Sequence, residues 1–256
     1  MSQTEVTGQL DQTTGRLVLS NPQKYNALPQ SAWLSIRPAM EKLVADGARV
    51  IIICGSDSHF CAGADISEFD TLRKNAATAR VYEASNVEAF AAVRNCPVPT
   101  IAKLQGYCLG GGFGLAAACD LRVAEPNAKF AVPAAKLGLG YPVDAMADIV
   151  AAVGAQNAKR LLFTAARFSA EQMQEMGFVM DLVDAAALDD HVEALAASIC
   201  QLAPLTHRAT KASIGAMKSG DWEGAKLASD ATFASQDYAE GRAAFREKRA
   251  AKFSGH

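Results

Sequence analysis

Hydrophobic positions along this chain recur with two periods, and the two parts of the chain differ in the period they show. Up to residue 187, short runs of apolar residues alternate with longer stretches of helical spacing, which is the pattern of a mixed α/β fold. From Leu188 onward the spacing is helical to the end. We therefore predict an α/β core unit over residues 1–187 and an α-helical region over residues 188–256.

The expected strands are apolar runs bounded by turn residues. The run from Arg49 to Cys54 is the clearest, because its continuous β-branched residues are typical of a strand buried on both faces. The other predicted strands are 4–10 and 15–20, joined as a hairpin, then 100–104, 121–124, 129–132 and 178–183.

The expected helices follow the spacing of apolar residues and end at proline or glycine. In the core unit they are predicted at 33–44, 67–93, 115–119, 144–153 and 156–165. A further short helix is predicted to be capped by Ser169 and to end at Met176. In the C-terminal region they are predicted at 188–202, 205–218, 222–233 and 238–253.

A glycine-rich corner over residues 106–120 is the strongest candidate for chemistry. Three consecutive glycines, Gly110–Gly112, stand between a predicted strand and a helix of small residues. Glycines leave the backbone N–H groups uncovered, and the helix dipole makes this end positive, so the corner suits a phosphate or a developing oxyanion. A tight packing turn is the alternative. The stretch from Gly112 to Ala117 also fits a dinucleotide pattern, but no second βαβ half follows it.

Composition narrows the class of protein. The chain has 256 residues, half of them hydrophobic, and a formal net charge of −2, which gives no reason to expect nucleic-acid binding. Six scattered cysteines without a C-x-x-C pair indicate reduced thiols, and four distant histidines argue against a metal cluster. With no signal sequence and no apolar run long enough to span a bilayer, we expect a cytoplasmic protein that does not bind membranes.

Three separated stretches, taken in order, resemble the crotonase superfamily, the enoyl-CoA hydratase/isomerase family. They are 60–66 (Phe-Cys-Ala-Gly-Ala-Asp-Ile), 106–112 and the C-terminal 237–249. The resemblance implies a spiral of ββα units with a helical trimerisation region, assembled as homotrimers or as hexamers built from two trimers. It also implies an acyl-CoA substrate of fatty acid metabolism, with coenzyme A as part of the substrate and no separate cofactor.

The resemblance also implies site residues. The N–H groups of Ala64 and Gly111 are expected to form an oxyanion hole for the thioester carbonyl, which agrees with the independent interpretation of the glycine corner. Phe245 and Lys248 are expected to reach the nucleotide end of CoA from an adjacent subunit. The expected CoA-binding positions in the core unit are Lys24, Ala27, Ala62, Ala64, Asp65, Ile66 and Gly111.

Both glutamates of the family's hydratases are replaced, by Gly114 and Ala134. Hydration needs one group to activate water and another to protonate the α-carbon, and neither glycine nor alanine can do this. Ordinary hydratase activity is therefore not expected.

A second resemblance bears on the missing glutamates. The segment 137–141, Leu-Gly-Leu-Gly-Tyr, is similar to a segment of the superfamily's methylmalonyl-CoA decarboxylases, in which the tyrosine is the acid-site residue. Decarboxylation of a malonyl-type thioester needs no base, and Tyr141 would orient the leaving carboxylate. The chain departs from those enzymes at Ala64, where they carry histidine, and a packing role for Tyr141 is the alternative.

Several acidic residues and one histidine remain to be placed. Glu68, Asp144 and Asp148 are candidates for the acyl pocket, with a solvated helix start as the favoured alternative for the two aspartates. Asp65 is expected to cap the next helix, Asp120 to close the small-residue helix, and His59 to be an exposed loop residue. Decarboxylation is the favoured reaction. The alternatives are an atypical hydratase or isomerase with other acids, thioester hydrolysis, or a non-catalytic acyl-CoA-binding protein.

Overall fold

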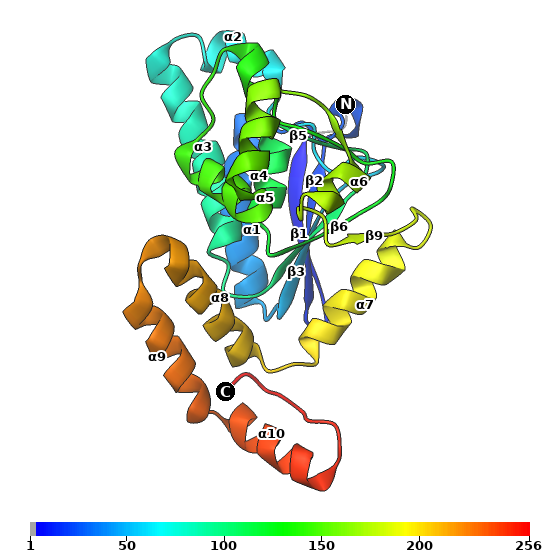
Figure 1. The fold of residues 1–256 in the computed structure, drawn as a ribbon, viewed down its shortest axis with the longest axis vertical. Coiled ribbons are helices and arrows are strands. Elements are labelled where there is room, and N and C mark those ends of the chain that lie inside the picture. The colour runs from blue at the N-terminus through cyan, green and yellow to red at the C-terminus, as the bar shows by residue number, and fades with distance from the viewer. Residues whose placement is uncertain (1–3) are drawn as a thin grey trace.

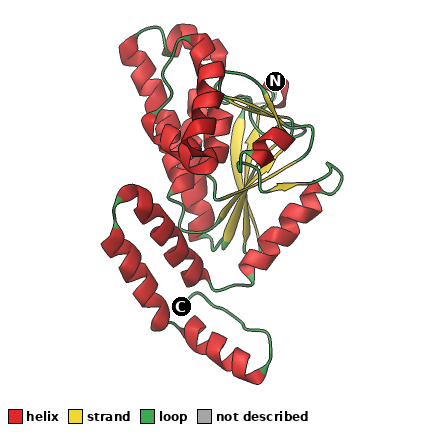
Figure 2. Cartoon of the chain, viewed as in Figure 1, coloured by secondary structure: helices red, strands yellow, loops and turns green. Residues whose placement is uncertain are grey.

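The computed structural model describes residues 4–256, so residues 1–3 of the predicted core unit lie outside the described part. An α/β body is followed by a helical C-terminal region (Figures 1 and 2). The strands are β1 (Glu5–Asp11), β2 (Thr14–Ser20), β3 (Val50–Gly55), β4 (Thr100–Leu104), β5 (Tyr107–Leu109), β6 (Leu121–Ala124), β7 (Lys129–Ala131), β8 (Phe168–Ser169) and β9 (Asp181–Leu182).

The helices occupy most of the remaining chain. The α-helices are α1 (Gln30–Ala45), α2 (Phe69–Leu72), α3 (Ala76–Arg94), α4 (Gly111–Ala118), α5 (Val143–Thr164), α6 (Ala170–Glu175), α7 (Leu188–Cys200), α8 (Pro204–Ser219), α9 (Trp222–Phe233) and α10 (Gln236–Glu247). The 3-10 helices are η1 (Pro22–Lys24), η2 (Ile66–Glu68) and η3 (Pro133–Leu137).

The main sheet has six strands in the order β1-β2-β3-β4-β6-β9. The hairpin β1–β2 is antiparallel, and every later pairing in this sheet is parallel. A smaller sheet has the order β5-β7-β8. Because β5 and β7 pair in parallel, the chain must cross over between them, and α4 makes that crossover.

Helices cover both faces of the main sheet, as Figure 1 shows. On one face, Ile51 and Ile53 join the large core with Trp33 of α1 and Phe90 of α3. On the other face, the alternate residues of β3 pack with Leu188 and Val192 of α7. Both faces of β3 are therefore buried under apolar side chains, which explains its unbroken run of β-branched residues.

The predicted helix 67–93 is wrong as a single element. It is divided into η2, α2 and α3, with a break at residues 73–75. The cause is Asn75, whose side chain accepts hydrogen bonds from the N–H groups of Ala77 and Thr78, while the Thr78 hydroxyl accepts one from the backbone N–H of Asn75. This capping box makes α3 begin as a separate helix.

Other boundaries differ from the predictions for local reasons. The helices predicted at 144–153 and 156–165 form α5, whose junction is Gly154 at φ 75°. The predicted helix 238–253 ends at Glu247, because Lys248 adopts a left-handed conformation that terminates α10. The strand predicted at 178–183 is reduced to β9, and β5 was not predicted.

The C-terminal helices α8, α9 and α10 extend away from the body (Figure 1). They expose large apolar side chains, among them Met217, Trp222, Leu227, Phe233 and Phe245. After α10 the chain folds back along it, and the N–H of Gln236 donates to the carbonyl of His256. Among the described residues, no helix is long and apolar enough to cross a membrane.

Candidate active site

A small cavity of about 120 Å³ lies where five segments of the body meet. These segments are the loop 62–66, α2 with the residue that follows it, the middle of α3, the start of α4 and the segment 133–142 that contains η3. The cavity is lined by Ala62, Gly63, Ala64, Ile66, Phe69, Arg73, Glu83, Asn86, Phe90, Gly110, Gly111, Pro133, Ala134, Leu137, Leu139, Tyr141 and Pro142.

The glycine corner and the loop 62–66 bring two backbone N–H groups to the same wall. Gly110 has φ 52° and ψ −118°, which glycine tolerates, and α4 starts at the next residue. A Cβ atom built on Gly111 would lie 3.8 Å from the nitrogen of Ala64, and one built on Gly63 would lie 3.2 Å from the nitrogen of Gly111. Within residues 4–256, neither the Ala64 nor the Gly111 N–H has a hydrogen-bond acceptor. Two neighbouring donors are thus available to one oxygen atom.

The predicted CoA-binding residues of the loops lie around this wall. Ala62 lines the cavity, Ile66 stands at its edge with 69% of its surface exposed, and Ala27 is buried. The Lys24 ammonium donates to Asp65 over 2.6 Å and to the Ser67 hydroxyl over 2.9 Å.

Asp65 has the structural role that was expected, since it caps η2 by accepting from the N–H of Ser67. Burial alone would raise the pKa of the Asp65 carboxyl, but hydrogen bonds from Lys24 and Ser67 outweigh burial and hold this pKa below its ordinary value. The pairing leaves the Lys24 side chain about half exposed beside the loop.

Tyr141 lies over the position of the first missing glutamate. Its hydroxyl donates to the Gly110 carbonyl over 2.8 Å, and it fills the space that a Cβ atom at Gly114 would need. Burial raises the pKa of the Tyr141 phenol, so the group stays a neutral donor. Ala134, at the position of the second glutamate, forms part of the apolar wall.

Three polar side chains of the cavity were missed in the sequence: Arg73, Glu83 and Asn86. Glu83 is the single carboxylate among the lining residues given above. Asn86 had a usable signal, because a polar residue on the apolar stripe of a predicted helix must find a partner or face a cavity. Glu83 had no such signal, since its position toward the cavity depends on how α3 packs.

The acidic candidates from the sequence have other partners. Glu68 accepts from the backbone N–H of Gln30 over 2.8 Å at the start of α1. Asp148 is buried between Arg94 and Lys218, with ion pairs of 2.6 and 2.7 Å. Glu68, Asp148 and the exposed Asp144 are not among the cavity's lining residues, so the structure does not bring these candidates to the acyl pocket.

Asp120 has a structural role just after α4, as expected, whereas His59, expected to be an exposed loop residue, is partly buried and has partners. Asp120 accepts from the Thr100 N–H over 2.7 Å and pairs with Lys211 over 2.6 Å. The Nδ1 atom of His59 accepts from the Tyr107 N–H over 3.0 Å, and the two rings stack.

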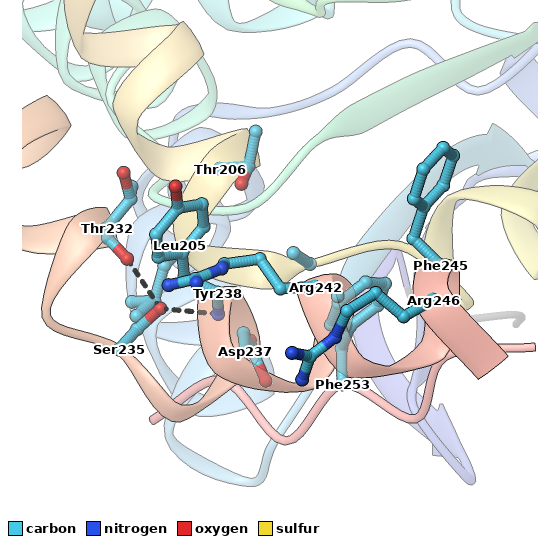
Figure 3. A pocket seen from close by; sticks show the side chains of 12 residues that line it. Leu205, Thr206, Thr232, Ser235, Asp237, Tyr238, Arg242, Phe245, Arg246 and Phe253 are labelled. Carbon is cyan, nitrogen blue, oxygen red and sulfur yellow. Dashed lines mark hydrogen bonds between the residues drawn. The ribbon is translucent and has the colours of Figure 1, made fainter.

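Phe245 and Lys248 lie on the C-terminal region, away from the cavity. Phe245 is 86% exposed on a groove of about 550 Å³ that α10 forms with the start of α8 and the end of α9. Arg242 and Arg246 line the same groove, shown in Figure 3. A single chain does not bring these residues to the loop 62–66, so their role toward CoA stays a prediction that requires an adjacent subunit.

Comparison with known proteins gives consistent matches along nearly the whole chain. A family model described as enoyl-CoA hydratase/isomerase matches residues 10–256. Crotonyl-CoA hydratase of Syntrophomonas wolfei is 35% identical over 243 residues, which is 93% of each chain. The peroxisomal Delta(3,5)-Delta(2,4)-dienoyl-CoA isomerase of Arabidopsis thaliana is 28% identical over 79% of this chain and 77% of its own length. A solved structure of an enoyl-CoA hydratase/carnithine racemase from Magnetospirillum magneticum superposes with a TM-score of 0.94 at 33% identity, covering 100% of this chain and 97% of that one.

Proposed function

This chain belongs to the enoyl-CoA hydratase/isomerase family, and from that premise we propose that it decarboxylates a malonyl-type acyl-CoA thioester. The predicted crotonase fold is confirmed, and the chain is an enzyme of this family that acts on acyl-CoA. The observation that supports decarboxylation is the place of Tyr141, whose neutral hydroxyl takes the space over Gly114 that a glutamate side chain would enter.

The proposed reaction needs no base. The bond between the α-carbon and the substrate carboxylate breaks, CO₂ leaves, and the electron pair passes into the thioester as an enolate. The negative oxygen is stabilised by the N–H groups of Ala64 and Gly111, reinforced by the N-terminus of α4. A proton then adds to the α-carbon and gives the saturated acyl-CoA.

Tyr141 would act by orientation. Its phenol is held by the Gly110 carbonyl, next to the oxyanion corner, and its raised pKa keeps it protonated. When substrate binds, the hydroxyl would turn from the Gly110 carbonyl and donate its one proton to the substrate carboxylate, holding it at an angle from which the breaking bond overlaps the thioester π system. A carboxylate at residue 114 would instead repel the substrate.

The test is to measure CO₂ release and acyl-CoA products from malonyl-CoA and methylmalonyl-CoA, next to hydration of crotonyl-CoA. We expect decarboxylation and little hydration. Tyr141→Phe should lower decarboxylation by about 10- to 100-fold, the value of about one to two hydrogen bonds. Hydration near the common enzyme rate of about 10 s⁻¹ without CO₂ release would overturn the proposal. Tight acyl-CoA binding without any turnover would favour the non-catalytic alternative.

Double-bond isomerisation is the second candidate, favoured by Glu83. A single carboxylate can shuttle one proton between two carbons of an enoyl-CoA, and Glu83 is the carboxylate that lines the cavity. Conversion of 3-enoyl-CoA to 2-enoyl-CoA, followed by the absorbance of the conjugated product, distinguishes this reaction from decarboxylation.

A further inference from the structure

Glu83 is unusual among the acidic residues near the cavity because its carboxylate has no partner. Asp65 is held by Lys24, Glu68 by Gln30 and Glu88 by Arg37. Glu83 lines the cavity, is partly exposed, and makes no hydrogen bond or ion pair with any residue from 4 to 256. An acidic side chain directed to a cavity without a structural partner is free to act on a ligand.

The surroundings of Glu83 place it in the same small cavity as the two free N–H groups. One turn further along α3, Asn86 is only 9% exposed, and its side-chain nitrogen has no hydrogen-bond partner within the described chain. Phe90 follows on the same face and closes the cavity beneath Tyr141 and Gly114. Glu83 and Asn86 are therefore the polar lining residues on α3; Arg73 adds a cation to the lining, and Leu137 and Leu139 are among its apolar members.

We propose that Glu83 is the residue that transfers protons at the α-carbon of the bound acyl-CoA. The carboxylate of Glu83 removes a proton from the α-carbon. The electron pair of the broken C–H bond then forms the enolate, whose oxygen lies at the N–H groups of Ala64 and Gly111. The protonated Glu83 returns a proton to the same carbon. This inference shares the oxyanion corner with the proposed function, but it does not require loss of CO₂.

The consequence for decarboxylation is direct. Once CO₂ has left, the enolate needs a proton, and Gly114 and Ala134 cannot supply one. The carboxyl group of Glu83 lines the same cavity and would supply that proton.

The test is the exchange of α-hydrogens of butyryl-CoA in D₂O, followed by NMR and mass spectrometry. This substrate carries no carboxylate, so exchange reports proton transfer alone. Glu83→Gln, which keeps the shape of the side chain, should lower exchange by about 100-fold or more, as expected for loss of a general base. Glu83→Asp should recover part of the rate.

A matched control is Glu88→Gln, which changes a carboxylate on the same helix that pairs with Arg37 over 2.7 Å and does not line the cavity. It should exchange at the wild-type rate. Exchange by Glu83→Gln at the wild-type rate, with butyryl-CoA still bound, would overturn the inference. Wild-type enzyme that releases CO₂ but exchanges no α-hydrogen would overturn the role of Glu83 and leave decarboxylation standing. Wild-type enzyme that exchanges α-hydrogens but releases no CO₂ would overturn decarboxylation and would leave the proposed role of Glu83 standing.

Discussion

At the scale of single residues, the oxyanion corner depends on what lies behind Gly111. This glycine has an ordinary helical conformation, so its lack of a side chain is not required by its φ. A side chain is excluded at residue 111 by Trp33, whose ring carbon Cζ2 would lie 2.9 Å from a Cβ atom there. The Trp33 ring is fully buried in the core and cannot move aside easily. Residue 111 must therefore be glycine for its N–H to stay beside that of Ala64.

Gly111→Ala should lower activity because the new methyl group pushes the first turn of α4 away from Trp33 and moves the N–H. We expect a loss of about 100-fold, comparable with removal of one oxyanion-hole donor. Steady-state kinetics on the true substrate, after circular dichroism has confirmed the fold, checks this expectation. Gly215→Ala is the matched control, because this helical glycine has no atom within 4 Å of the added methyl group. Full activity of Gly111→Ala would show that the glycine corner is only a packing turn and does not form an oxyanion hole.

Gly111→Pro tests the donor by comparison with Gly111→Ala, because both variants add a Cβ atom that meets Trp33 and only proline also removes the N–H. Residue 111 is the first residue of α4, a position at which proline suits the helix. The substitution removes the N–H, so acyl-CoA chemistry should be lost in a protein that still folds. Undiminished turnover by this variant would refute the oxyanion role of the corner.

At the scale of elements, the end of α10 is held by one carboxylate. Glu240 accepts two hydrogen bonds from Arg249, of 2.5 and 2.9 Å, and one from the N–H of Lys252. The segment predicted as helix therefore turns back after Lys248 and is fastened to α10. The Arg249 guanidinium, with the Lys252 N–H, lowers the pKa of Glu240 to about 2.

The pH dependence of this attachment follows from the sign of that shift. A carboxyl whose pKa is lower in the folded state stabilises the fold above its unfolded pKa of about 4.3, and the contribution disappears as the pH falls through the folded value. At pH 3.5 the segment after α10 should still be attached. In Arg249→Gln, Glu240 should titrate near its usual pKa, and hydrogen exchange of residues 249–256 should be faster at that pH. Glu223→Gln, on the exposed start of α9, is the control and should leave this exchange unchanged.

At the scale of the whole molecule, the C-terminal helices leave several large apolar side chains exposed within residues 4–256. Large apolar side chains gathered on an exposed surface are typical of an interface. The surface carries Phe245, predicted to reach CoA in a neighbouring subunit, and Figure 3 shows it beside Arg242 and Arg246. Assembly and CoA binding are thus expected to depend on the same region.

Deletion of residues 236–256, which removes α10 and the segment after it, should disrupt a homotrimer or hexamer and weaken acyl-CoA binding together. Analytical ultracentrifugation gives the assembly state, and titration with butyryl-CoA gives the affinity. Phe245→Ala is the finer variant, because an 86% exposed side chain adds little to the stability of a single chain. A truncated protein that remains trimeric and binds butyryl-CoA normally would contradict the assignment.

The sequence by itself determined the features that short segments encode. The hairpin 4–20, the buried strand around Ile52 and helix 222–233 follow from hydrophobic period and turn residues, and the structure confirms them. The glycine corner and the fold were also predictable, because a run of glycines and three ordered motifs carry their information locally.

The tertiary structure decided everything that depends on contacts between distant segments. It placed Trp33 behind Gly111, put the Tyr141 hydroxyl over Gly114, and gave Glu68 a structural partner. It also turned Glu83 toward the cavity. Periodicity tells which face of a helix is buried, but whether a polar side chain meets a partner or a cavity depends on the packing of residues that are 27 to 78 positions apart in the sequence.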